Sequence, residues 1–209
     1  MISFRPNTWD ANIWNSIVEH NEYGIINDWP HNVIDIGGHI GSFSYFITTK
    51  KGAKKSIVIE PDPSNFKLLQ TNLQPQIEQG KVIAFNVGIG SPNTALSLVQ
   101  HIADNTGGIS YTESSNGNIP TTTLDNLINL LDNSPILLKL DCEGCEYAAL
   151  SQCSQLHRIN AIVGEFHVRP DKNVSFLQDI LSSQNFEFNY HYTGSEYIGL
   201  FGAHQKQSG

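Results

Sequence analysis

The sequence predicts an α/β fold in which helices cover both faces of a largely parallel sheet. Short, continuously apolar runs, which are typical of strands buried on both faces, alternate with longer segments whose apolar residues recur at helical spacing. Acidic residues and glycines follow several of these runs, which places them together at one edge of a parallel sheet. Near the C-terminus, two aromatic-rich runs flank Thr193-Gly194-Ser195 and are expected to form an antiparallel hairpin at the edge of the sheet.

The first half of the chain alternates between strands and helices. The expected strands are residues 32–36, 56–59 and 82–87, with a peripheral fourth strand over residues 95–100. After the first strand, residues 41–49 place Phe43, Phe46 and Ile47 on one helical face. After the second strand, Ser64 is expected to cap a helix, because its hydroxyl is able to accept a hydrogen bond from a free amide of the first turn.

The second half continues the same alternation. The expected helices are an apolar stripe over residues 124–131, a segment over residues 144–153 and a stripe over residues 176–181. The expected strands are residues 136–140 and 161–166, followed by the hairpin strands 186–192 and 197–203. Residues 105–118 are rich in Gly, Ser and Asn and are interpreted as a loop inside the domain.

The whole chain, residues 1–209, is expected to form one domain. Its length suits one α/β domain and is short for two, and no repeat or linker divides it. A helical segment is expected over residues 1–30 and the core over residues 31–204. The helical segment carries an apolar cluster that is expected to pack on the core rather than to cover a site; its members are Trp9, Ile13, Trp14, Ile17 and Val18.

Composition and charge limit the partners. The formal net charge is −8 and no run of Lys or Arg occurs, so a nucleic-acid partner is not expected. No apolar stretch reaches the roughly 18–20 residues of a membrane helix, and residues 1–10 lack the pattern of a secretory signal. Three cysteines gathered in one segment do not indicate a disulfide framework. We therefore expect a cytoplasmic protein without a membrane partner; the sequence does not indicate an oligomeric state.

Two acidic residues at expected strand ends point to a nucleoside ligand. Asp35 precedes Gly37 and Gly38, where its carboxylate is placed to accept a hydrogen bond from a ligand ammonium group and would repel a pyrophosphate. Gly41 is expected to allow close packing of the helix that follows. Glu60 ends the next strand and is placed to accept hydrogen bonds from both ribose hydroxyls. A nucleoside with an amine and no phosphate fits this pair, and S-adenosylmethionine is such a molecule.

Further carboxylates and a histidine follow the strands over residues 136–140 and 161–166. Asp141, Glu143 and Glu146 come after the first of these strands, and the first helical turn favours negative charge at the two glutamates. Lys139 is a candidate ion-pair partner. His167 follows the second strand and is expected to neighbour Asp141, as a general base whose pKa is held near neutrality.

These motifs together resemble the FkbM family of methyltransferases, from about residue 23 to about residue 181. The resemblance rests on Asp35-Ile36-Gly37-Gly38, Glu60-Pro61-Asp62, residues 86–90, 123–125 and 139–146, and Glu165-Phe166-His167. It implies a class I methyltransferase (Rossmann-like) three-layer sandwich, with a mostly parallel seven-stranded sheet that has one antiparallel strand. It also implies S-adenosylmethionine as the methyl donor and a hydroxyl oxygen of a small molecule, a sugar or a natural product as the acceptor.

The resemblance also implies roles for individual residues. Asp35, Gly37 and Gly41 would cradle the methionine moiety, Glu60 would hold the ribose, and Asn86 and Val87 would border the adenine. Asp141 and Glu143 would face the site of methyl transfer, with Glu165 and His167 opposite. The full set of expected cofactor contacts is Asp35, Gly37, Gly38, His39, Gly41, Glu60, Pro61, Asn86, Val87 and Asp141.

The chain departs from the family pattern at three positions. His39 stands where the family usually has Asn. Cys142 and Cys145 stand where small or aliphatic residues are usual, and we interpret them as small apolar side chains. A redox-active pair, favoured by the helix start, and a zinc site, which lacks a second ligand pair nearby, are the alternatives.

Several alternatives for the function remain open. His167 and Asp141 are the candidate catalytic residues, and Glu143 and Glu165 are expected on the acceptor side. No metal ligand is assigned. A divalent ion held by Asp141 and Glu143 is an alternative way to acidify the hydroxyl of the acceptor. A nucleoside-binding module without catalysis is a second class of function. A nicotinamide dehydrogenase is disfavoured because position 39 lacks the glycine of the phosphate loop. Residues 100–120 are expected to shape the acceptor pocket, and the acceptor itself is not identified.

Overall fold

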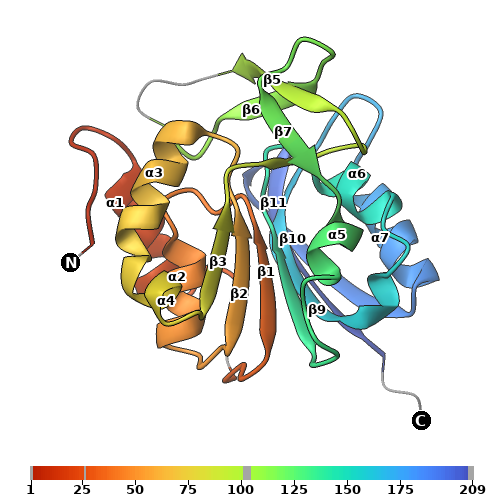
Figure 1. Ribbon diagram of the computed structural model, residues 1–209. Coiled ribbons are helices and arrows are strands. Elements are labelled where there is room, and N and C mark those ends of the chain that lie inside the picture. The colour runs from red at the N-terminus through yellow and green to blue at the C-terminus, as the bar shows by residue number, and fades with distance from the viewer. Residues whose placement is uncertain (1, 26, 101–104, 207–209) are drawn as a thin grey trace.

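A seven-stranded sheet forms the centre of the molecule and is covered by helices on both faces (Figure 1). The computed structural model describes residues 2–25, 27–100 and 105–206. The strand order is β10-β11-β9-β8-β1-β2-β3. The strands are β1 (Asn32–Ile36), β2 (Lys55–Ile59), β3 (Val82–Phe85), β8 (Ile136–Leu140), β9 (Ile159–His167), β10 (Phe186–Ser195) and β11 (Ile198–Gln205).

The direction of the strands confirms the expected sheet. Neighbouring strands from β3 to β9 run parallel, whereas β11 runs antiparallel to both β9 and β10. The C-terminal hairpin therefore lies at the edge, with β11 inserted next to β9 and β10 outermost. Strand order reverses at β1, which pairs with β2 on one side and β8 on the other. In sheets of this kind, ligands bind beyond the carboxyl ends of the strands at such a reversal.

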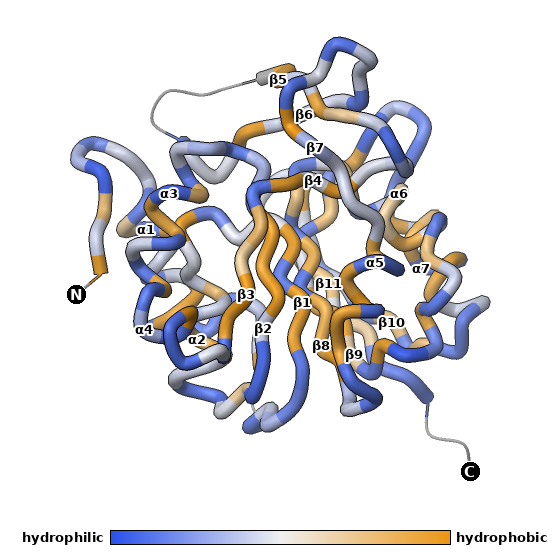
Figure 2. Tube along the Cα trace, in the orientation of Figure 1, coloured by the Kyte–Doolittle hydropathy of each residue, from blue (hydrophilic) through white to orange (hydrophobic). Residues whose placement is uncertain are grey.

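Two groups of helices bury the two faces of the sheet (Figure 1). One group consists of α1 (Asp10–Trp14), η1 (Asn15–Glu19), α2 (Ser42–Thr49), α3 (Pro63–Asn72) and α4 (Gln74–Glu78). The other group consists of α5 (Leu124–Ile128), α6 (Glu146–Ser151) and α7 (Val174–Ser183), with a short 3-10 turn, η2 (Leu156–Arg158). Side chains alternate along β1, so that Val33 packs with the first group and Ile34 with the second. Figure 2 shows the hydrophobic residues concentrated along the central strands.

The N-terminal helical segment packs on the core, but Trp9, Ile13 and Ile17 also line the cavity described below, so the expectation that it packs rather than covers a site is only half right. It begins as an α-helix over Asp10–Trp14 and continues as a π-helix over Asn15–Glu19. Trp14, Ile17 and Val18 are buried against the first group of helices. The cap of α3 differs from the prediction: Asp62, not Ser64, is the capping residue, because Asp62 Oδ1 accepts hydrogen bonds from the first backbone amides of the helix.

A second, four-stranded sheet lies above the carboxyl ends of the large sheet (Figure 1). Its order is β4-β7-β5-β6, formed by β4 (Gly88–Ile89), β5 (Ala95–Gln100), β6 (Ser110–Glu113) and β7 (Ile119–Thr122). The expected peripheral strand is confirmed as β5. The interpretation of residues 105–118 as a loop is wrong where β6 pairs antiparallel with β5. The strand expected over residues 82–87 ends at Phe85, because the chain leaves the sheet to form β4.

Candidate functional site

A cavity of about 450 Å³ lies at the carboxyl ends of β1, β2 and β8, where strand order reverses. One wall is the glycine turn after β1, and another is formed by α1 and η1. Residues 105–111 contribute a further part of the wall. A second cavity of about 480 Å³ lies beside the first, between the small sheet and α6, and the two share Gly37, Pro61, Tyr111, Cys142 and Glu143. The site therefore offers two adjoining spaces at one edge of the sheet.

The glycine turn is held tightly between the neighbouring strand ends. Gly37 has a φ of +81°, and a Cβ atom there would collide with the backbone carbonyl of Asp141. The amides of Gly37 and Gly38 both donate to the carbonyl of Ile59, at 3.1 and 2.9 Å. Gly41 does not line the cavity; a Cβ there would meet Leu73, so this glycine serves the close helix packing that the sequence predicts. The turn thus brings bare backbone to the cavity surface.

Asp35 lies beneath this turn and does not line the cavity. Its side chain is fully buried; Oδ2 accepts a hydrogen bond from Ser44 Oγ at 2.7 Å, and Oδ1 lies 3.3 Å from Lys139 Nζ. The expectation of a direct contact between Asp35 and a ligand ammonium group is therefore wrong. The reason is the register of β1 and β8, which places Asp35 opposite Lys139.

Lys139 lines the floor of the cavity with its ammonium group. Its Nζ donates to the carbonyls of Ile36, at 3.3 Å, and Gly37, at 2.5 Å, and lies 3.9 Å from Asp141 Oδ2. Burial lowers the pKa of Lys139, but the charges of Asp35 and Asp141 outweigh it and raise that pKa. The lysine therefore stays a cation that holds the backbone of the glycine turn.

Glu60 reaches the cavity as the sequence predicts. It is 5% exposed; Oε2 accepts from the amide of His39 at 2.8 Å and Oε1 from the amide of Asp62 at 2.9 Å. Burial raises the pKa of this carboxyl to about 7, against the lowering effect of these hydrogen bonds. Each carboxylate oxygen has a second lone pair, so Glu60 retains the capacity to accept hydrogen bonds from a ligand.

Three buried polar atoms around the cavity have no hydrogen-bond partner among the described residues. They are His39 Nδ1, Ser42 Oγ and Asn65 Oδ1, and all three residues line the cavity. Unsatisfied buried polar atoms are rare and require a reason. A polar ligand with several donors and acceptors, such as the ribose and amino acid ends of S-adenosylmethionine, fits this set.

The expected adenine contacts do not lie in either cavity. Asn86 Nδ2 donates to the backbone carbonyls of Glu60 and Pro61, at 2.8 and 3.0 Å, and so braces the turn that carries Glu60. Val87 packs against the hydrophobic core. Neither lines a cavity, whereas Pro61 does. The chain leaves β3 at Phe85, which turns Asn86 and Val87 away from the strand edge.

His39 is anchored by residues that the sequence analysis missed. Its Nε2 lies 2.9 Å from Thr106 Oγ1 and 3.4 Å from Asp10 Oδ1, and Thr106 donates to the same oxygen of Asp10 at 2.7 Å. Arg5 pairs with Asp10 at 2.8 Å. Burial raises the pKa of Asp10, but its hydrogen bonds from His39, Arg5 and Thr106 outweigh this and hold the pKa well below its usual value. The N-terminal segment therefore supports the glycine turn from outside the core.

The opposite end of the cavity is acidic. Asp141, Glu22, Glu143 and Glu165 all line it. Tyr23 donates to Asp141 Oδ2 at 2.8 Å, and Asp141 Oδ1 accepts no hydrogen bond from the described part of the chain. Burial, together with the charge of Asp141, raises the pKa of Glu22 and Tyr23. This end attracts positive charge.

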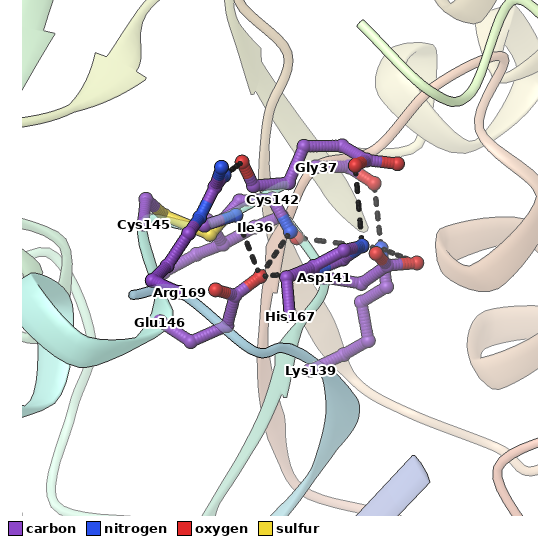
Figure 3. Close-up of a disulfide and its surroundings, with 11 residues drawn as sticks. Ile36, Gly37, Lys139, Asp141, Cys142, Cys145, Glu146, His167 and Arg169 are labelled. Carbon is purple, nitrogen blue, oxygen red and sulfur yellow. Dashed lines mark hydrogen bonds and ion pairs between the residues drawn. A yellow bond between two sulfur atoms is a disulfide. The ribbon is translucent and has the colours of Figure 1, made fainter. Parts of the chain in front are cut away.

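His167 is held by three glutamates rather than by Asp141, and Figure 3 shows one of them, Glu146, beside the imidazole. Its Nε2 lies 3.1 Å from both Glu143 Oε2 and Glu165 Oε1, and its Nδ1 lies 3.1 Å from Glu146 Oε1. Burial lowers the pKa of His167, but the three carboxylates outweigh it and hold that pKa far above its usual value. The partners of His167 are therefore these glutamates and not the expected Asp141, and the raised pKa disfavours His167 as a general base.

The two cysteines after β8 form a disulfide (Figure 3). The interpretation of Cys142 and Cys145 as separate apolar side chains is therefore wrong, and a thiolate zinc site at this pair is excluded while the bond is intact. Between them, Glu143 and Gly144 adopt left-handed backbone conformations, with φ of +56° and +111°. Cys153 is a free thiol whose Sγ lies 3.0 Å from Asp125 Oδ1.

A family model matches most of the chain. Residues 35–192 match the family model described as the Methyltransferase FkbM domain. No curated protein matches the sequence. Within the described part of the chain, no helix has the length and hydropathy needed to cross a bilayer.

Solved structures share the fold at low identity. A methyltransferase FkbM from Methylobacillus flagellatus KT is 18% identical with a TM-score of 0.61, over 91% of this chain and 48% of that chain. The chain thus spans about half the length of that protein. A precorrin-6y C5,15-methyltransferase from Geobacter metallireducens GS-15 is 10% identical with a TM-score of 0.54, over 98% of this chain and 92% of that one. TrmK from M. capricolum, in complex with S-adenosyl-homocysteine, is 11% identical with a TM-score of 0.54, over 90% and 68%.

Proposed function

Because the chain belongs to the FkbM family of S-adenosylmethionine-dependent methyltransferases and has the class I methyltransferase fold, we propose that it methylates a hydroxyl oxygen of a small molecule or saccharide. The observation that carries the proposal is the arrangement of the site. Glu60 and three unsatisfied polar atoms lie around a cavity whose acidic end contains Asp141, next to a second cavity. Two adjoining spaces suit two reactants.

The chain offers contacts for each part of the cofactor. Glu60 would accept hydrogen bonds from the ribose hydroxyls, and Ser42 Oγ and Asn65 Oδ1 are free to bond polar groups nearby. The carboxylates at the acidic end favour the positive charges of the sulfonium and ammonium groups. When bound, S-adenosylmethionine supplies an electrophilic methyl group on a sulfonium sulfur. Asp35 supports this site from below by holding Lys139 rather than by touching the ligand.

We assign the proton transfer to Asp141. An alcohol is a weak nucleophile until its proton is removed, and a positioned base contributes about 10²–10⁴-fold. Asp141 lines the cavity, and its Oδ2 is fixed by Tyr23 while Oδ1 is available as an acceptor. The hydroxyl proton would pass to this carboxylate as the oxygen forms its new bond to carbon. His167 would instead orient Glu143 and Glu165 on the acceptor side.

The proposal is tested with labelled methyl donor and a panel of acceptors that contains alcohols, sugars and amines of matched size. We expect transfer to hydroxyl acceptors, and a fall in turnover of about 10²–10⁴-fold in Asp141→Asn with S-adenosylhomocysteine binding retained. Asp179→Asn, on an exposed position of α7, is the control and should leave turnover unchanged. Transfer confined to amines, or wild-type turnover in Asp141→Asn, would contradict the proposal.

A further inference from the structure

Three ligand atoms converge at the acidic end of the cavity. Glu143 Oε2, Glu165 Oε1 and His167 Nε2 all lie within 4.8 Å of one another. The imidazole nitrogen is 3.1 Å from each of the two carboxylate oxygens. Ligands bound at about 2.1 Å to one ion, at right angles to each other, are separated by about 3 Å. The two distances from the imidazole nitrogen therefore match adjacent positions around a metal ion.

The imidazole is oriented by a buried carboxylate on its other side. His167 Nδ1 lies 3.1 Å from Oε1 of Glu146, whose side chain is fully buried. The same oxygen accepts from the amides of Cys142, at 3.3 Å, and Gly144, at 3.1 Å, so it does not move freely (Figure 3). Histidines that bind metals usually donate their second N–H to a carboxylate or carbonyl in this way. The arrangement directs Nε2 at the two other glutamates.

The position between Nε2 and the two carboxylates requires a positive charge. Without one, the nitrogen lone pair would face two negative oxygens. Within the described residues, neither Glu143 nor Glu165 forms an ion pair with Lys or Arg. Lys139 pairs instead with Asp35 and Asp141. Arg169 donates to the backbone carbonyl of Glu143 and not to its carboxylate. A proton supplies only one charge for a cluster of three glutamates, and a divalent ion would supply two.

The cluster is open towards the acceptor. Glu143 and Glu165 are about one quarter exposed, at 26% and 25%, and both line the first cavity beside Asp141. An ion held by three protein ligands would keep free positions on the cavity side, where an oxygen of the acceptor could bind. This is the arrangement of a catalytic metal site rather than of a closed structural one.

We propose that Glu143, Glu165 and His167 bind a divalent transition-metal ion, such as Mn²⁺ or Fe²⁺, at the acceptor end of the cavity. Two carboxylates and one imidazole with open positions favour these ions over Mg²⁺ and Ca²⁺, which prefer oxygen ligands alone. The use of the ion rests on the proposed function: coordination of the acceptor hydroxyl lowers the pKa of that hydroxyl, and Asp141 takes the proton. The pair suggested by the sequence, Asp141 and Glu143, shares only Glu143 with this set.

Binding is tested with Mn²⁺ on the full chain in non-reducing buffer, by the loss of the free-ion signal in electron paramagnetic resonance. We expect one equivalent to bind, and Glu143→Gln or Glu165→Gln to weaken binding at least 10-fold. Glu146→Gln, which alters the support of His167, should weaken it about 10–100-fold. Glu187→Gln is the matched control, because it removes a carboxylate from an exposed histidine pair, 3.4 Å from His204. S-adenosylhomocysteine binding to each variant reports that it is folded.

The outcomes separate this proposal from the function proposed above, since the titration needs neither cofactor nor acceptor. Absence of Mn²⁺ binding to the wild-type chain, or equal binding in the wild type, Glu143→Gln and Glu165→Gln, overturns the metal site. Hydroxyl methylation that persists unchanged in a chelator overturns the role of the ion and leaves the methyltransferase proposal standing. One bound equivalent that both glutamine variants lose supports the site, even if no hydroxyl acceptor is found.

Discussion

The ammonium group of Lys139 lies 3.3 Å from the carboxylate of Asp35, below the glycine turn and away from solvent. Both side chains are at most 2% exposed. The lysine also donates to the turn above it, at the carbonyl of Gly37. A buried ion pair of this kind stabilises a particular backbone arrangement only while both partners are present.

Replacement of the lysine should therefore destabilise the chain strongly. We expect Lys139→Met to lower the free energy of unfolding by about 3–5 kcal/mol, because it leaves Asp35 buried without a counter-charge. The double variant Asp35→Asn, Lys139→Met should recover part of this loss. Urea unfolding measures both values. If the free energy of unfolding of Lys139→Met lay within about 1 kcal/mol of the wild-type value, the ion pair would not stabilise the glycine turn as proposed.

Glu60 should make stability depend on pH. Its folded pKa, about 7, lies above its ordinary value of 4.5, so its contribution to stability is fully present below 4.5 and is lost as the pH rises through about 7. We expect the melting temperature of the wild type to fall relative to that of Glu60→Gln between pH 5 and pH 8. Glu187→Gln, at an exposed position, should show no such divergence. A constant difference across this range would contradict the burial of an ionising Glu60.

Gly37 and Gly52 offer a matched test of the glycine turn. Both have positive φ, +81° and +78°, but a Cβ would collide with backbone only at Gly37 and would meet nothing within 4 Å at Gly52. Each alanine variant should lose about 1–2 kcal/mol from its left-handed conformation. Only Gly37→Ala should also lose S-adenosylhomocysteine affinity, as measured by calorimetry. Equal affinity in the two variants would mean that the turn is not part of the cofactor site.

The thiols should report the disulfide directly. After denaturation without reductant, alkylation and mass spectrometry should find one modified cysteine, Cys153, and reduction should expose three. In the native chain, Cys153 should react slowly, because burial and Asp125 raise its pKa to about 12. Cys153→Ser should show no modified thiol before reduction. Three modified cysteines without reductant would disprove the bond between Cys142 and Cys145.

The parallel part of the large sheet could be predicted because its strands are short and mostly apolar runs, and its antiparallel edge because two aromatic-rich runs flank Thr193-Gly194-Ser195. β6 could not, because Ser110–Glu113 is polar and becomes a strand only through its pairing with β5. The division into one domain over residues 1–209, the cytoplasmic location and the class of acceptor stay predictions.

The site was harder to predict than the fold, since its contacts depend on register and loop geometry. Glu60, Gly37 and Asp141 reach the cavity because each follows a strand directly. The pairing of Asp35 with Lys139 depends on the register of β1 and β8, which spacing along the chain does not reveal. Glu143 has a left-handed backbone conformation and lies in the loop closed by the disulfide, and these two features bring its side chain to His167. The pattern of apolar residues gives no sign of either feature.

The contacts of Asp10 and Thr106 with His39 have a consequence for where a shortened version of this chain can begin. The stretch shared with the family begins at residue 35, yet Asp10 and Tyr23 lie before it and touch His39 and Asp141. A shortened protein that begins at residue 35 would lose residues 32–34 of the central strand β1, together with Asp10 and Tyr23, which contact residues of the cavity. A shortened protein that keeps the cavity intact must therefore begin well before residue 35, where the match to the family starts.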